Sequence, residues 1–220
     1  MNLWLYIDGY CERLEPGFWN EPVNAVSNLA FLLAALIMAH RLRGAGLPLA
    51  RGMVWILAII SLGSFLFHTF ATVWASVADV GPIMAFILLY VFASVQDYMR
   101  LGRIWAMLSV PLFFFYTALG VQFTQYIPGI GSSAEYAVIP PLILFFAAFV
   151  WRHNRATGRG LVIGALLLTL SIGFRSLDLA NCAANPLGTH FIWHILNAIM
   201  LAWMIEVYRR HMVAAPPPER

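Results

Sequence analysis

Seven apolar stretches, each about as long as a membrane-crossing helix, restrict the fold of this chain more than any other feature. A helix crosses the core of a bilayer with about 20 consecutive apolar residues. Hydrophobic residues make up 61% of the sequence and charged residues only 10%, which is far from the balance of a soluble domain. Bounded by charges, Gly or Pro, the predicted helices cover residues 23–42, 52–70, 79–98, 103–122, 134–151, 160–178 and 188–208.

This pattern predicts an all-α membrane protein whose single domain, residues 23–208, is a seven-transmembrane-helix bundle. Residues 1–22 contain four acidic residues and no basic start, so we interpret them as an ordered extramembrane N-terminal arm instead of a signal peptide. Residues 209–220 include three consecutive prolines and are predicted to form a disordered tail. No internal repeat or second domain is visible.

The basic residues indicate how the bundle is oriented. All thirteen are Arg, and the missing Lys excludes a retinal Schiff base, so the seven helices are not those of a rhodopsin. Eleven lie in connections on one side of the predicted bundle: Arg41, Arg43, Arg51, Arg100, Arg103, Arg152, Arg155, Arg159, Arg209, Arg210 and Arg220. The positive-inside rule then predicts a multi-pass protein of a bacterial inner membrane, with the N-terminus outside and the C-terminus cytoplasmic. In short loops these charges report topology, and they do not indicate nucleic-acid binding.

Polar residues inside a bilayer are costly, and five of them gather at one predicted depth. Ser64 and His68 are four residues apart near the end of the second helix, and His190 and His194 repeat that spacing at the start of the seventh. Residues at i and i+4 share one helical face. Asp79 opens the predicted third helix. At 1.5 Å per residue, all five lie within ~10 Å of the outer ends of their helices.

Three neutral imidazoles with a fourth position open to water are typical of a catalytic zinc site. His68, His190 and His194 are therefore the predicted ligands. Asp79 is placed to transfer a proton, and the Ser64 hydroxyl to stabilise a developing oxyanion. The pattern predicts a zinc hydrolase with its active site towards the outer leaflet.

Other interpretations stay open at this point. The histidines could simply form hydrogen bonds between helices, and Ser64 could bond to a carbonyl of its own helix. Asp178 could pair with Arg175 or orient a ligand histidine. A b-type haem electron carrier would place paired histidines on facing helices at both membrane depths. A transporter would show broken helices in two matching halves, a symmetry that this sequence lacks.

At these residues the sequence resembles the alkaline ceramidase family, in the wider superfamily of seven-helix membrane hydrolases that includes the adiponectin-receptor-like proteins. The similar segments span residues 8 to 198: Tyr10-Cys11-Glu12, Trp19-Asn20-Glu21-Pro22, Ser27-Asn28-Leu29, Gly63-Ser64 to Phe67-His68, Asp79, and His190 to Trp193-His194. The resemblance implies zinc on the three histidines, catalysis by Ser64 and Asp79, and a ceramide or related N-acyl lipid as substrate. A receptor-like or lipid-remodelling relative with another substrate is the alternative in the same superfamily.

The resemblance further implies a calcium site in the arm, built from Asp8, Glu12 and Glu21. The match is incomplete, because the family has an acid where this chain has Gly9, and an Asn where it has Leu14. The alternative is an acidic arm that contacts helix termini or Arg13.

The family pattern also pairs the arm cysteine with one in the last outer connection, here Cys11 and Cys182. The predicted topology puts both on the outer face, where disulfides persist.

Overall fold

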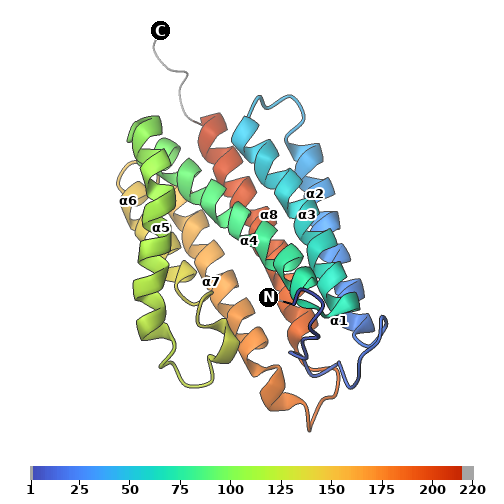
Figure 1. Cartoon of the computed structure of the whole chain (residues 1–220). Helices are drawn as coiled ribbons and strands as arrows, with labels where there is room; N and C mark the ends of the chain where they lie inside the picture. Colours follow the sequence, from blue (N-terminus) through green and yellow to red (C-terminus); the bar gives the residue numbers. More distant parts are fainter. Residues whose placement is uncertain (1, 215–220) are drawn as a thin grey trace.

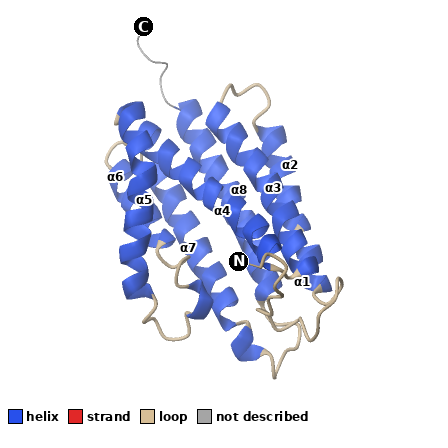
Figure 2. Ribbon diagram, viewed as in Figure 1, coloured by secondary structure: helices blue, strands red, loops and turns tan. Residues whose placement is uncertain are grey.

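The computed structural model describes residues 2–214 of the chain as a bundle of helices (Figure 1). Helices and connecting loops account for the whole of this described part, apart from one isolated β-bridge (Figure 2). The long helices are α2 (Leu29–Arg41), α3 (Pro48–Phe70), α4 (Val73–Ala93), α5 (Gly102–Thr124), α6 (Ile139–Trp151), α7 (Arg155–Leu177) and α8 (His190–Ala214). The short ones are α1 (Pro22–Ser27), a π-helix at Ser94–Tyr98, and 3₁₀ turns at Gly131–Ser133 and Leu179–Asn181.

Six helices are long and apolar enough to cross a membrane, when α1 is taken with α2 and the π-helix with α4. The chain is therefore an all-helical protein with six candidate membrane spans in its described part. The seventh apolar helix, α6, has only 13 residues and corresponds to the prediction for 134–151. It begins five residues later than predicted because Pro140 and Pro141 lack an N–H and fit only the first turn of a helix.

Three other boundaries differ from the prediction in ways that matter. Helix α4 begins at Val73, so Asp79 lies inside the helix and not at its start. Helix α7 begins at Arg155 because the Asn154 side chain accepts a hydrogen bond from the Thr157 backbone N–H, at 3.0 Å. Helix α8 continues to Ala214. The expectation of disorder from residue 209 is therefore wrong for residues 209–214, whereas residues 215–220 lie outside the described residues.

Helix α8 is the central helix of the bundle. It packs against α2, α3 and α7, whereas α5 is the most exposed of the candidate spans. Helices α3 and α4 approach each other closely at Gly63, where a β-carbon would lie only 2.0 Å from the Ala78 carbonyl oxygen. Only glycine permits this approach, which brings Asp79, the next residue on α4, against the polar face of α3.

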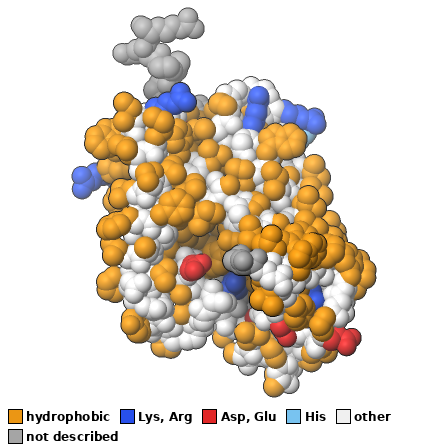
Figure 3. Space-filling view, viewed as in Figure 1, with side chains coloured by type: hydrophobic (Ala, Val, Ile, Leu, Met, Phe, Trp, Pro, Cys, Tyr) orange, Lys and Arg blue, Asp and Glu red, His pale blue; other side chains and the backbone are white. Residues whose placement is uncertain are grey.

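The surface of the bundle is apolar over most of the face shown in Figure 3. Large hydrophobic side chains such as Trp55, Ile104 and Leu112 are exposed on several helices, as expected of a surface in contact with lipid tails. Most of the basic side chains visible on this face lie towards the end where α8 finishes (Figure 3).

The N-terminal arm lies over the opposite end of the bundle, beside the connection between α3 and α4 (Figure 1). The Ile7 N–H donates to the Ala71 carbonyl at 2.8 Å, and the Val73 N–H donates to the Leu5 carbonyl at 3.1 Å. Ala71 has a left-handed backbone with φ of +46°, an uncommon conformation for a residue with a β-carbon. It ends α3 and turns the chain towards α4 within two residues.

Candidate metal centre

Three buried imidazoles meet between α3 and α8. Nitrogen atoms of His68, His190 and His194 all lie within 4.8 Å of one another, and the ring centroids are 4.5–5.1 Å apart. This is the one group of three or more metal-binding side chains in the described part of the chain. The i, i+4 spacing of His190 and His194 directs both rings towards the end of α3 that carries His68. The predicted ligand set is thus brought together.

A neighbouring residue fixes the free nitrogen of His68. The Nδ1 atom of His68 lies 2.5 Å from the Glu21 carboxylate, an acceptor, so Nδ1 carries the proton. Its Nε2 atom is then left with a lone pair, and it is buried without a hydrogen-bond partner. Glu21 is held in turn by Arg13. Burial alone would raise the pKa of the Glu21 carboxyl, but His68 and Arg13 outweigh burial and hold that pKa below its usual value.

His194 is fixed in the same way from another helix. The Ser27 hydroxyl donates its single proton to the Asn24 carbonyl at 2.8 Å, so it accepts from Nδ1 of His194, 2.7 Å away. His194 therefore also keeps its Nε2 lone pair free. Ring orientation by such outer contacts is common around metal ligands.

His190 begins α8, and Asp178 positions it. The Oδ1 atom of Asp178 accepts the backbone N–H groups of Thr189 and His190 at 2.6 and 2.9 Å. Its Oδ2 atom accepts the backbone N–H of Cys11 at 3.0 Å. Of the two roles considered for Asp178, positioning a histidine fits these contacts better, although they hold the backbone at the start of α8 and not the His190 ring. No ion pair between Asp178 and Arg175 is present in the described part of the chain.

These contacts fit a tetrahedral ion such as zinc. Zn–N bonds of about 2.0–2.1 Å place ligand nitrogens about 3.4 Å apart. The ring nitrogens of the three histidines lie within 4.8 Å of one another, so this separation is compatible with their positions. Each ring also has a nitrogen that can bind a metal. His68 and His194 offer Nε2, and the Nδ1 atom of His190 is buried without a hydrogen-bond partner. Three neutral nitrogens leave one position of a tetrahedron for a further ligand.

Ser64 and Asp79 line a cavity of about 300 Å³ together with His190 and His194. The Oδ1 atom of Asp79 is buried without a hydrogen-bond partner in the described residues. Asp79 reaches this position from inside α4, through the close approach at Gly63. The two predicted catalytic groups therefore share one cavity with the histidines, although Asp79 is not the helix-opening residue that the sequence predicted.

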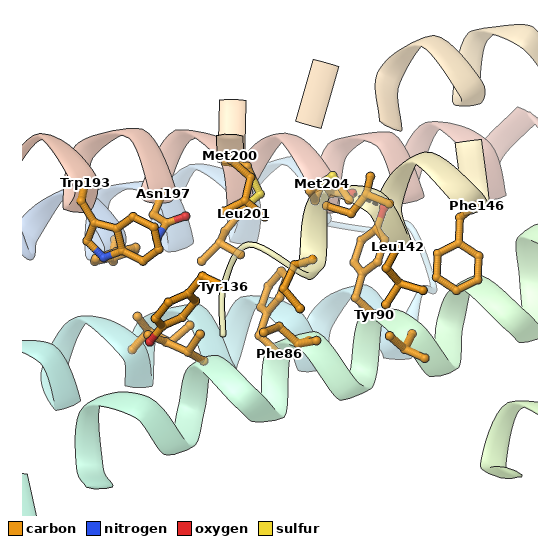
Figure 4. A pocket seen from close by; sticks show the side chains of 18 residues that line it. Phe86, Tyr90, Tyr136, Leu142, Phe146, Trp193, Asn197, Met200, Leu201 and Met204 are labelled. Atoms are coloured by element: carbon orange, nitrogen blue, oxygen red, sulfur yellow. Dashed lines mark hydrogen bonds between the residues drawn. The ribbon is translucent and has the colours of Figure 1, made fainter. Parts of the chain in front are cut away.

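A second, narrow cavity of about 70 Å³ lies between the helices of the bundle, and Figure 4 shows the side chains that line it. The two cavities share lining residues, including Ile83, Tyr136 and Trp193. Along α8 the labelled side chains of the second cavity run from Trp193 to Met204 (Figure 4), which is about 16 Å at 1.5 Å per residue. Its lining is almost entirely apolar. A polar centre therefore adjoins an elongated apolar space.

The sequence suggested Arg175 only as a partner for Asp178 and gave no sign of its place in the cavity. This side chain lines the same cavity as Asp79 and the α8 histidines. The periodicity of α7 carries no signal for such a role, because the contacts of Arg175 come from distant segments.

The acidic residues of the arm are not gathered into a group that could hold calcium. Glu12 accepts the backbone N–H groups of Val23 and Asn24 and so caps α1. Glu21 is engaged by Arg13 and His68, and Asp8 is exposed. The three form no cluster of metal-binding atoms in the described chain. The alternative interpretation, contacts with a helix terminus and with Arg13, is the one observed.

Arg13 is a buried cation in the same region. Besides Glu21, its guanidinium donates to the Gly17 carbonyl at 3.0 Å and to the His68 carbonyl at 2.9 Å. These bonds join the arm to the end of α3 that carries His68.

Cys11 and Cys182 form the disulfide that the resemblance implied. It links the arm to the connection between α7 and α8, beside Asp178. The φ of +64° at Gly188, where a β-carbon would meet Asp178 and Cys11, allows this connection to close.

The sequence matches no model of a known protein family, and no curated protein matches it.

Proposed function

We propose that this protein is a zinc-dependent amidohydrolase of the membrane, similar to the alkaline ceramidases, that cleaves ceramide or a related N-acyl lipid into a fatty acid and an amine. The observation that carries the proposal is the position of the three oriented imidazoles, at the junction of a polar cavity and an elongated apolar one. A lipid amide has matching parts, since a polar reacting group continues directly into a long apolar chain.

The residues of the site divide the work of hydrolysis. His68, His190 and His194 would hold the zinc ion, which when bound supplies Lewis acidity to a carbonyl and to water. Asp79 accepts a proton from the attacking water and returns it to the leaving nitrogen as the C–N bond breaks. The Ser64 hydroxyl donates a hydrogen bond to the carbonyl oxygen as negative charge develops there. Water thus adds its oxygen to the acyl carbon, and its protons end on the two products.

The geometry of the histidines favours this function over haem-based electron transfer. A haem would have to lie between two imidazoles, and rings with centroids 4.5–5.1 Å apart leave no room for a porphyrin.

The proposal includes seven spans, with α6 as the fifth crossing. Helix α6 is about 20 Å long at 1.5 Å per residue, and it packs along α7. The irregular segment before it is partly enclosed by protein, as in the Tyr116 hydroxyl bond to the Val138 carbonyl at 2.7 Å. Non-helical backbone at membrane depth is tolerated where protein covers it.

The same topology places the N-terminus outside, the C-terminus in the cytoplasm, and the site in the outer leaflet of a bacterial inner membrane. Reporter fusions at cytoplasmic positions test it against fusions at external ones: Arg43, Arg103 and Arg155 against Thr72 and Ser132. The reverse pattern would contradict this orientation.

Two substitutions test the division of work. Asp79→Asn keeps the size of the side chain but removes the base, so kcat for fatty acid release from ceramide should fall by ~10²–10⁴. Ser64→Ala should lower it by ~10²–10³. Both variants should retain zinc, because neither residue is a ligand. A fully active Asp79→Asn variant would overturn the mechanism.

A further inference from the structure

Arg175 is a cation in the cavity of the metal centre without a carboxylate partner in the described part of the chain. Its Nη1 atom donates to the hydroxyls of Ser132 and Ser133 at 2.8 and 3.0 Å. Its Nη2 atom donates to the Tyr10 hydroxyl at 3.4 Å. All three partners are neutral, whereas charged side chains inside a membrane protein usually pair with an opposite charge.

Two aromatic rings lie beside this guanidinium. The Cζ atom of Arg175 lies 5.1 Å from the ring centroid of Tyr136 and 5.7 Å from that of Trp193, within the range of cation–π attraction. Both of these rings also line the two cavities. The charge is therefore held at the junction between the polar site and the apolar space.

One edge of the guanidinium remains available. Arg carries five N–H donors, of which the two on Nη1 and one on Nη2 are directed to the hydroxyls. Within the described residues the Nε proton and one Nη2 proton have no recorded acceptor. The Nε/Nη2 side of a guanidinium is the side that can bind a carboxylate through two parallel hydrogen bonds. Asp79, the carboxylate in the same cavity, is not within ion-pair distance of Arg175.

The ligand for this edge follows from the reaction, so the inference rests on the proposed function. Hydrolysis of a lipid amide converts a neutral acyl group into a fatty acid carboxylate within this cavity. Tyr10 connects the two places, because its ring stacks on His190 at 3.7 Å between centroids and its hydroxyl contacts Arg175.

We propose that Arg175 is a binding residue for the carboxylate of the fatty acid, which it holds by its Nε/Nη2 edge beside the metal centre. The first carbons of the acyl chain then enter the apolar cavity of Figure 4. The same contact gives product inhibition by fatty acid and positions a fatty acid for the reverse reaction, amide formation with an amine and loss of water.

The test measures binding without turnover, on the full-length protein in nanodiscs after the metal is removed with a chelator. Palmitate and hexadecanol are compared, because they share an apolar chain and differ in the anionic head. The wild type should bind palmitate about 10–100-fold more tightly, the range for a charge-assisted bidentate contact. In 1-¹³C-palmitate the bound carboxyl should titrate at lower pH than in protein-free nanodiscs, because the adjacent cation favours its ionised form.

Arg175→Gln should lose the preference for palmitate and the shifted titration, and still bind hexadecanol as the wild type does. Arg175→Lys keeps the positive charge but lacks the paired N–H donors of a guanidinium, so it should retain part of the preference for palmitate. This variant provides the test if Arg175→Gln does not fold. Arg51→Gln, an exposed position at the far end of α3, is the matched control and should behave as the wild type.

Two results would overturn the inference: an undiminished palmitate preference in Arg175→Gln, or an equal loss of both ligands. A wild type that discriminates palmitate but hydrolyses no amide would instead refute the proposed function alone.

Discussion

Gly63→Ala is the smallest change that should separate Asp79, the proposed catalytic carboxylate, from the candidate metal centre. The added β-carbon would lie 2.0 Å from the Ala78 carbonyl oxygen, whereas ordinary van der Waals contact begins at 3.4 Å. Helices α3 and α4 must therefore move apart locally by about 1.4 Å, the difference between these two distances. Asp79 follows Ala78 directly, so the displacement moves it away from Ser64.

The expected effect is mainly on catalysis. Misplacement of a catalytic group by about 1 Å costs on the order of 10²-fold in rate, and overpacking of this kind costs roughly 1–3 kcal/mol of folding free energy. The proposed ligands lie on α3 and α8 and none lies on α4, the helix that is displaced from them, so zinc should be retained. The assay is fatty acid release from ceramide by the purified protein, with zinc content and thermal unfolding measured on the same sample.

Gly52→Ala is the matched control at the same interface. Its β-carbon would meet only the Cδ2 atom of Leu89 on α4, at 3.1 Å, and a flexible side chain can move away. The reasoning fails if Gly63→Ala works at the wild-type rate, or if Gly52→Ala loses as much activity.

Two further predictions concern the arm. Glu21→Gln removes the charged acceptor that orients His68, so zinc affinity should fall ~10–100-fold. Metal competition titrations measure this affinity, with a Glu15→Gln variant, changed at an exposed position, as the control. An unchanged zinc affinity in Glu21→Gln would refute this role of Glu21. Reducing the Cys11–Cys182 bond should lower the free energy of unfolding by ~2–4 kcal/mol, which denaturant titration with and without reductant measures. Two thiols that react with a labelling reagent before reduction would show that the bond does not form.

The histidine centre could be predicted from sequence because its signals are local and regular. Helical spacing puts His190 and His194 on one face, and the depth of His68 in its span brings it to the same level. The periodicity that predicts a span also predicts the level of each residue within it.

The supporting contacts could not be predicted in that way. Asp79 lies within α4 because the chain turns at Ala71 with a positive φ. The sequence has no Gly, Asn or Pro at this position that would predict such a turn. Arg175 meets Ser132 and Tyr10, which come from two distant segments without a periodic pattern. The late start of α6 was readable, since two adjacent prolines mark a first helical turn.

Zinc content of the purified protein tests the central claim most directly. The wild type should carry about one zinc ion per chain, as a single site with three histidine ligands requires. His68→Ala and His194→Ala should each lose the ion, while His153→Ala, whose histidine is remote from the centre and contacts the Tyr98 carbonyl, should keep it. A wild type without stoichiometric metal, or alanine variants that bind zinc as the wild type does, would contradict the account.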